Sequence, residues 1–168
     1  MGISVIFTNF LLNFLKNYGM INRAIFQNLK NDLLHSNKII VLYGARQTGK
    51  TTLADQIISS FEGRVLKINA DELKYIDVFS SRDFNKMSLL VDGQDLLFID
   101  EAQRIPDIGI NLKILQDALP ELKILVTGSS FFDLAGKISE PLTGRTITYT
   151  LYPFSLTEIR AQKSIFEI

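Results

Sequence analysis

Two short polar motifs of the chain have the residue types and the spacing that phosphate chemistry requires. The first is a loop bounded by glycines and ended by a lysine and a hydroxyl residue, Gly44-Ala45-Arg46-Gln47-Thr48-Gly49-Lys50-Thr51. The second is an acidic pair, Asp100-Glu101, which closes an apolar run further along the chain. Together the two motifs predict that the chain binds a nucleoside triphosphate.

The loop offers both a backbone cradle and two reactive side chains to a phosphate. Glycine lets the backbone turn so that successive N–H groups point at phosphate oxygens, and the N-terminus of a following helix attracts negative charge. Lys50 is expected to reach the β- and γ-phosphates, and the Thr51 hydroxyl to bind Mg²⁺, which prefers oxygen ligands. We expect every loop residue to bind the nucleotide, together with Thr52, whose side chain we expect to face the helix interior.

Asp100 and Glu101 are predicted to have separate roles. A carboxylate at the end of a buried strand beside the loop is placed to hold Mg²⁺, directly or through water, which makes Asp100 the second predicted metal ligand. The next side chain points elsewhere because the strand ends there, and an acid at that position can polarise the attacking water, which makes Glu101 a predicted catalytic residue. The alternative is a surface pair that caps the next helix. The apolar run and the upstream loop favour the catalytic interpretation.

A third polar group follows another apolar run, at Thr127, Ser129 and Ser130. A hydroxyl there could bond the γ-phosphate or the attacking water, and Ser129 is our first choice for this catalytic role. Because Ser and Thr are also common N-caps, the same residues could instead begin a helix at 131–134.

The elements around these motifs alternate between strand and helix, which predicts an α/β fold with a mostly parallel sheet covered on both faces. Ligands of such sheets bind outside the carboxyl ends of the strands, where all three polar groups fall. The 64–69 strand alternates apolar and polar residues and is expected near an edge. Strands are expected at residues 38–43, 64–69, 95–100, 122–127 and 146–151, and helices at 21–34, 52–58, 110–119, in one or two pieces over 71–90, and from Ser155.

Composition fits one domain and excludes several kinds of chemistry. With 168 residues, 46% of them hydrophobic, the chain can bury a core without disulfides. Equal numbers of basic and acidic residues, 18 each, give no overall field toward nucleic acid, and no nucleic-acid site is evident. The absence of cysteine excludes thiolate metal sites and fits a cytoplasmic location.

The apolar N-terminal extension, residues 1–20, allows more than one interpretation. Its apolar run is too short to span a bilayer as a helix, so no transmembrane segment is expected. It could be an amphipathic docking helix, which its low charge favours, or an interfacial membrane helix. Translation could also begin at Met20.

Five sequences of the chain carry a resemblance to a known family: those at 44–53, Phe-Ile-Asp-Glu-Ala-Gln at 98–103, Val-Thr-Gly-Ser-Ser at 126–130, Leu-Thr-Gly-Arg at 142–145 and Leu-Tyr-Pro-Phe-Ser-Leu-Thr-Glu at 151–158. With these motifs the chain resembles the AAA-superfamily ATPases of bacteria and archaea called AAA_14. The resemblance covers roughly residues 21–160 and implies a three-layer P-loop fold with strand order 5-1-4-3-2, Mg-ATP as ligand and Glu101 as catalytic acid/base.

The resemblance also implies roles for an arginine and for a missing region. Arg145 matches a position from which an arginine of related ATPases reaches a γ-phosphate, often in a neighbouring subunit; a structural ion pair is the equal alternative. Arg46 and Arg104 are weaker candidates. Family members normally continue through a lid and a further domain, so residues 21–168 are interpreted as an ATP-binding core that lacks its C-terminal lid. Its expected partner is another protein or that absent domain.

Three functions remain open from the sequence. The first is an ATP hydrolase whose nucleotide state switches its contacts with a partner, favoured by the tandem acids. The second is a P-loop kinase acting on a small molecule, for which the chain after Ser130 offers little acceptor pocket or arginine-rich lid. The third is a nucleotide-binding fragment with little or no catalysis. GTP specificity is disfavoured because Asn85-Lys86-Met87-Ser88 lacks the terminal Asp that would bind guanine.

Overall fold

The computed structural model describes residues 21–129 and 141–160. The chain divides into two compact units, one of which, Ile25–Pro153, contains the whole sheet. The described part of the other unit consists of residues 21–24 and 154–160. The expectations for residues 1–20, for Ser130 and for a helix at 131–134 lie outside the described residues.

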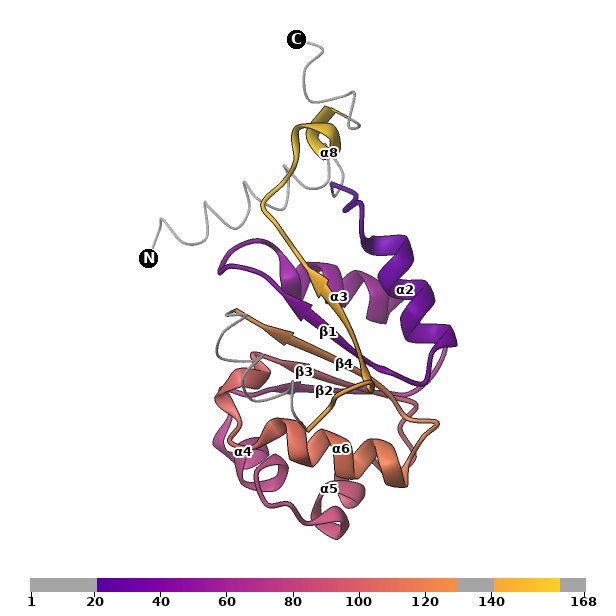
Figure 1. Cartoon of the computed structure of the whole chain (residues 1–168), viewed down its shortest axis with the longest axis vertical. Coiled ribbons are helices and arrows are strands. Elements are labelled where there is room, and N and C mark those ends of the chain that lie inside the picture. Colours follow the sequence, from indigo (N-terminus) through magenta and orange to yellow (C-terminus); the bar gives the residue numbers. More distant parts are fainter. Residues whose placement is uncertain (1–20, 130–140, 161–168) are drawn as a thin grey trace, which may run out of the picture. The chain divides into compact units, whose positions relative to one another are not determined.

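A parallel sheet of five strands forms the centre of the larger unit (Figure 1). Its order is β2-β3-β4-β1-β5, which read from the other edge is the 5-1-4-3-2 order expected from the sequence, so the predicted fold class is confirmed. Every neighbouring pair of strands is parallel. The strands are β1 (Ile39–Tyr43), β2 (Val65–Asn69), β3 (Leu96–Asp100), β4 (Lys123–Gly128) and β5 (Thr146–Thr150).

Helices cover both faces of this sheet, because successive side chains of each strand point to opposite sides. In β1, Ile40 and Leu42 pack with α2 (Phe26–His35) and α3 (Lys50–Ser59). The alternate residues of the strand, Ile39, Val41 and Tyr43, pack on the opposite face. That face is covered by α4 (Leu73–Phe79), α5 (Phe84–Val91) and α6 (Ile108–Ala118), which lie on the far side of the sheet from α2 and α3 in Figure 1.

Burial falls from the centre of the sheet to its edges. All five residues of β1 are buried, whereas β2 and β5 are only partly buried. The edge position of β2 confirms what its alternating sequence predicted. Since each buried aliphatic side chain contributes about 1.5–3 kcal/mol, the central strands β1, β3 and β4 form the most stable part of the fold. Side chains at the carboxyl ends of these strands are therefore attached to the most stable part of the fold.

Some helix boundaries differ from those expected. The 71–90 segment forms two helices, α4 and α5, because Arg82 adopts a left-handed conformation between them and the Asp83 carboxylate caps α5 by accepting from the Asn85 N–H at 2.9 Å. Helix α6 begins two residues early, since Asp107 turns the chain with φ 50° and Ile108 is buried. Helix α2 begins only at Phe26.

The smaller unit contains α8 (Leu156–Arg160) and a buried ion pair. Glu158 accepts hydrogen bonds from Arg23 Nε at 3.1 Å, from the Ala24 N–H at 2.9 Å and from the Ser155 N–H at 2.8 Å. Desolvation raises the pKa of Glu158, but these three bonds outweigh it and hold the pKa at about 2. Phe154 lies under the Arg23 guanidinium, 4.3 Å from ring centroid to Cζ. In the part of the chain that the structure describes, no helix has the length and apolarity needed to cross a membrane.

Candidate nucleotide-binding site

The loop of residues 44–49 connects the buried β1 to the N-terminus of α3, as the motif requires. Two of its residues, Gln47 and Gly49, adopt left-handed conformations with φ of 65° and 89°. The Ala45 carbonyl accepts bonds from Thr48 Oγ1 at 2.9 Å and from Lys50 Nζ at 3.1 Å. Lys50 is 5% exposed, so its ammonium group is held within the loop and not in solvent. The loop is therefore folded back on itself around the lysine.

Close packing around position 44 requires a glycine there. A Cβ at this position would lie 2.5 Å from the Leu151 carbonyl oxygen and 2.9 Å from Thr48 Oγ1. Its own N–H donates to the Gly128 carbonyl at 3.3 Å, so the loop begins in contact with the end of β4. Only glycine leaves room for the chain after β5 to pass this close.

Side chains from α3, β3 and β4 meet at the Asp100 carboxylate. Thr51 Oγ1 donates to Asp100 Oδ2 at 2.9 Å, and Thr127 Oγ1 donates to Asp100 Oδ1. The Glu101 N–H also bonds Asp100 Oδ1 and Thr127 Oγ1, each at 3.2 Å. The two residues expected to hold Mg²⁺, Thr51 and Asp100, are thus neighbours at the carboxyl ends of the strands.

Glu101 leaves β3 in a left-handed conformation, with φ 55°, and a short 3-10 helix, η1 (Ala102–Arg104), follows it. This turn places the side chains of Glu101 and Gln103 together. Gln103 Nε2 donates to Glu101 Oε2 and, at 3.0 Å, to Ser129 Oγ. Glu101 and Ser129, both expected in the site from the sequence, are therefore joined through a glutamine.

A cleft of about 460 Å³ opens beside the loop at the N-terminus of α3. One wall carries an ion pair, Arg104 Nε to Asp71 Oδ1 at 2.5 Å, in which both side chains are about half exposed. Thr52 is exposed here; its expected inward orientation is wrong because other side chains form the buried face of α3. The cleft is lined by Arg46, Gln47, Gly49, Lys50, Thr51, Thr52, Asp71, Glu101 and Arg104.

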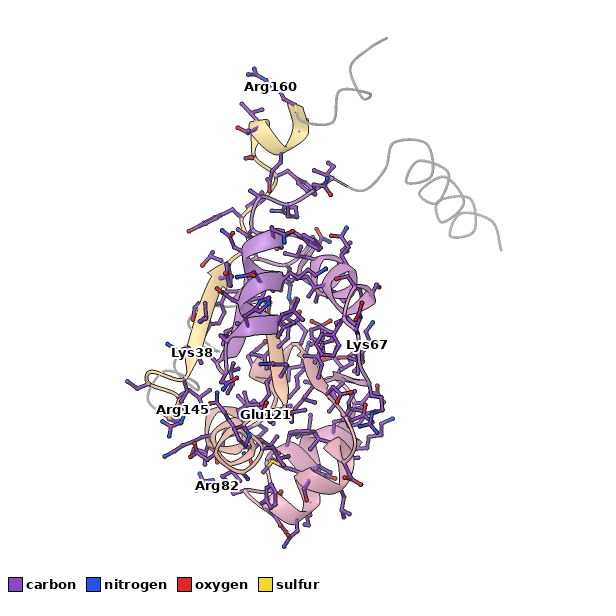
Figure 2. The ribbon with its side chains drawn as sticks, turned by 90° about the vertical axis from the view of Figure 1, so that its right-hand side faces the viewer. Lys38, Lys67, Arg82, Glu121, Arg145 and Arg160 are labelled. Carbon is purple, nitrogen blue, oxygen red and sulfur yellow. The ribbon has the colours of Figure 1, made fainter. Side chains whose placement is uncertain are left out.

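Arg145 lies away from this cleft within its own chain. It precedes β5, and its carbonyl accepts from the N–H of Ile39, the first residue of β1. Since β5 is parallel to β1, Arg145 lies at the amino ends of the strands, where its Nη2 pairs with Asp117 at 3.2 Å. In Figure 2, Arg145 lies near Lys38 at the β5 edge of the sheet, and Lys67 of β2 lies at the opposite edge. The expected γ-phosphate role of Arg145 could be exercised only on another chain.

Two participants in the site, Gln103 and Asp71, have no role predicted from the sequence, and Thr127 makes a contact with Asp100 that the sequence does not predict. Gln103 lies in the 98–103 sequence that resembles the family, and Thr127 lies in the same polar group as Ser129, but the bond from Thr127 to Asp100 requires the ends of β3 and β4 to be adjacent. The bond from Gln103 to Glu101 requires the turn that follows β3. Asp71 had no motif signal. Its position after the edge strand β2, at the carboxyl end of the sheet, is what brings it to the cleft.

The donor set fits Mg²⁺ bound together with phosphate. Thr51 Oγ1 and Asp100 Oδ2 are hard oxygen ligands on two rigid elements, within 2.9 Å of each other. Among the described residues there is no cluster of three or more His, Cys, Asp or Glu side chains that could hold a metal alone. Mg²⁺ keeps several waters and uses one or two protein ligands plus substrate phosphates, and Thr51 and Asp100 are ligands of that kind.

The sheet order, the loop between β1 and α3 and the acid at the end of β3 define a P-loop nucleoside triphosphatase fold. The family model of AAA_14, an AAA domain, matches residues 36–160. The chain therefore belongs to this family of AAA domains.

Relatives of known sequence agree with this assignment. An uncharacterized protein of Mycobacterium tuberculosis is 36% identical over 116 residues, which are 67% of this chain and 24% of that protein. An uncharacterized protein of Methanocaldococcus jannaschii is 30% identical over 125 residues, which are 73% of this chain and 28% of that protein. The chain thus spans about a quarter of the length of these relatives.

Solved structures share the fold at low identity. The Walker-type ATPase of Pyrococcus abyssi aligns with a TM-score of 0.63 at 20% identity, over 85% of this chain and 57% of that one. AMPPCP-bound DnaA from Aquifex aeolicus aligns with a TM-score of 0.59 at 19% identity, over 89% of this chain and 53% of that one. At these identities the likeness establishes the fold.

Proposed function

We propose that this domain binds Mg-ATP in the cleft beside the loop and hydrolyses it to ADP and phosphate. The observation that carries the proposal is the convergence of the Thr51 hydroxyl and the Asp100 carboxylate, 2.9 Å apart, next to the buried ammonium of Lys50 and the side chain of Glu101. A simple phosphate-binding turn needs only the loop. The acids from β3 supply what hydrolysis needs in addition.

In this proposal the loop N–H groups and Lys50 hold the phosphates, while Thr51 and Asp100 hold Mg²⁺. Mg²⁺ neutralises charge on the β- and γ-phosphates when bound. Thr127 donates to Asp100 and so keeps that carboxylate turned toward Thr51. The Lys50 ammonium, now bonded to the Ala45 carbonyl, exchanges that neutral acceptor for phosphate oxygens, which are stronger acceptors for a charged donor.

Glu101 is the proposed general base. Its carboxylate accepts a proton from water as the water oxygen bonds to the γ-phosphorus, and the bond from that phosphorus to the bridging oxygen of ADP breaks. The proton then passes to the released phosphate. Ser129 lies on the same side, joined to Glu101 through Gln103, and is proposed to bond the γ-phosphate or the attacking water.

Among the arginines, Arg104 fits a γ-phosphate role within one chain better than Arg145. It lines the cleft together with Lys50 and Glu101, whereas Arg145 lies at the other end of the strands. Its Asp71 partner is half exposed, and an ion pair of that exposure is weak enough for a phosphate to displace. We propose that Arg104 leaves Asp71 to stabilise charge on the transferring phosphoryl group.

The nucleotide state of the cleft is proposed to act as a switch on a partner protein or on a further domain. This rests on the family and on the span of the relatives, about four times the matched region. The ends of β2, β3 and β4 all reach the cleft or its hydrogen-bonded neighbours, so phosphate contacts there can move several loops at once.

A turnover assay with separate measurement of binding tests the proposal. The wild-type chain should bind ATP by calorimetry and release phosphate in the presence of Mg²⁺, and EDTA should stop the release. Glu101→Gln should keep the affinity for ATP and lower phosphate release by about 100-fold or more, the usual worth of a general base. Glu121→Gln, an exposed acid shown in Figure 2 and distant from the cleft, is the matched control and should leave the rate unchanged.

The alternatives give different results in the same assay. Tight ATP binding without phosphate release from the wild-type chain would indicate a nucleotide-binding fragment. Phosphate transfer to a small molecule, with negligible release to water, would indicate a kinase. Absence of ATP binding would overturn the proposal altogether.

A further inference from the structure

One glutamine links two groups of the site that come from different strands. Gln103 Nε2 donates to Glu101 Oε2, after β3, and to Ser129 Oγ, after β4, the second bond at 3.0 Å. A side-chain amide nitrogen carries two hydrogens, so both acceptors can be served at once by one rigid planar group. Glu101, Gln103 and Ser129 are all partly buried, where such bonds are stronger than in water.

Burial and backbone hydrogen bonds fix the main chain on both sides of Gln103, so the position of its Cα is well defined. Ala102 is fully buried, and the Ile105 N–H closes the short helix η1 by donating to the Ala102 carbonyl at 3.1 Å. The Glu101 N–H is bonded to both Asp100 and Thr127. With the backbone of Glu101 fixed by β3 and β4, the direction of its carboxylate depends on side-chain contacts, and Gln103 makes one of them.

We propose that Gln103 is a positioning residue that couples occupation of the γ-phosphate position at Ser129 to the orientation of the Glu101 carboxylate. This inference rests on the proposed hydrolysis of ATP and deepens it. The Ser129 hydroxyl can donate its own hydrogen to a phosphate oxygen while its oxygen still accepts from Gln103, because a hydroxyl both donates and accepts. Successive hydrogen bonds in a network strengthen one another, so a γ-phosphate bonded to Ser129 strengthens the hydrogen bond from Gln103 to Glu101.

The coupling would make the alignment of Glu101 depend on the presence of a triphosphate. ADP has no γ-phosphate to bond Ser129, so the chain through Gln103 to Glu101 is completed only when ATP is bound. The carboxylate that receives the proton is then aligned at the moment when a γ-phosphorus is present. Misplacing a reacting group by about 1 Å can lower a rate by about 100-fold, so alignment of this kind matters for turnover.

Substitution by methionine separates this role from packing. Gln103→Met keeps the length and approximate volume of the side chain and removes both donors. It should lower kcat by about 10- to 100-fold with KM for ATP within about twofold of wild type. The matched control is Gln116→Met on α6, whose amide donates to the Asn37 carbonyl at 2.6 Å, away from the cleft, and whose substitution should leave kcat unchanged.

A double-mutant cycle with Ser129→Ala tests the coupling itself. Ser129→Ala should lower kcat in the wild-type background and have little further effect in the Gln103→Met background. Additive losses from the two substitutions would overturn the coupling. Wild-type kcat in Gln103→Met, with Glu101→Gln inactive, would overturn the positioning role and leave the proposed hydrolysis standing.

Two further outcomes are decided by the same set of variants. If Gln103→Met fails to fold by circular dichroism, Gln103→Leu serves instead; it is apolar and has no donor, so it should lose turnover in the same way. A wild-type chain that releases no phosphate would overturn both the hydrolysis and the role of Gln103.

Discussion

The two ends of the sheet use charged and polar side chains in different ways. At the carboxyl ends, the exposed Thr51 of α3 is hydrogen bonded with partly or fully buried side chains from β3, η1 and the end of β4, around Asp100 and Gln103. At the amino ends, the charges form exposed pairs such as Arg64 with Asp95 and Arg145 with Asp117. Exposed pairs contribute little to stability, whereas a partly buried polar network costs desolvation and is retained where its chemistry is used. The contrast agrees with the proposal that the chemistry takes place at the carboxyl ends.

The largest expected effect is on ATP binding, at the loop. Lys50→Ala removes the buried ammonium that the loop encloses and should raise the Kd for ATP by about 100-fold, the scale of losing a charge-assisted bond to phosphate. The control is Lys67→Ala, whose amine pairs with Asp55 at 2.5 Å on the exposed β2 edge. Calorimetric titration measures both. Equal affinity in the two variants would mean that the phosphates do not bind at the loop.

Next in size is the contrast between two arginines at opposite ends of the strands. Arg104→Ala should lower kcat by about 100-fold, as the loss of one donor to a developing charge does, with ATP still bound. Arg145→Ala should change kcat by less than about twofold, since it removes only an exposed pair with Asp117. Phosphate release is followed at several protein concentrations. A concentration-dependent loss in Arg145→Ala would instead show that Arg145 acts on a neighbouring chain.

The sequence predicted the local parts of this site well and the contacts across it poorly. The loop, its flanking strand and helix, and the acids ending β3 follow from short patterns of residue type. The strand order came from the family resemblance, because pairing between distant strands leaves little trace in a single sequence. The meeting of Gln103 with Ser129 depends on that order and on the left-handed turn at Glu101, neither of which local spacing encodes.

Arg145 and Asp71 show that a motif in the sequence does not decide which residues lie at the cleft. Arg145 stands in a recognised sequence, yet it precedes a strand parallel to β1 and so lies at the amino ends of the sheet. Asp71 stands in no motif, yet it follows β2 at the carboxyl end and reaches Arg104. In a parallel sheet, whether a residue precedes or follows its strand decides which end it occupies. By this rule, Arg145 is assigned to the amino ends of the strands and Asp71 to the carboxyl ends.

Two glycines at opposite ends of the strands are expected to differ in their contribution to stability. Gly44→Ala places a Cβ 2.5 Å from the Leu151 carbonyl oxygen, a backbone atom that cannot move aside cheaply, and should lower the free energy of unfolding by about 1–3 kcal/mol. Gly144→Ala, at the amino end before β5, meets open space and only the strain of φ 75°, which costs about 1 kcal/mol. Urea denaturation compares them. A larger loss for Gly144 would contradict the packing of Gly44 against the chain after β5.

The smallest expected effect concerns acid stability at the amino ends. The N–H of Arg64, donating to Asp95 Oδ2 at 2.7 Å, lowers the pKa of Asp95 below its ordinary 3.8, against a smaller opposing desolvation, and the Arg64 charge adds to the lowering. A carboxylate with a lowered native pKa stabilises the fold above its unfolded pKa and loses that contribution as the pH falls through the native value. Asp95→Asn should therefore lower the thermal midpoint slightly at pH 6, and the difference from wild type should shrink below about pH 4. ATP turnover at neutral pH should be unaffected by this substitution. A loss of turnover in Asp95→Asn with the fold intact would show that the amino ends of the strands also take part in the chemistry, against the division between the two ends of the sheet.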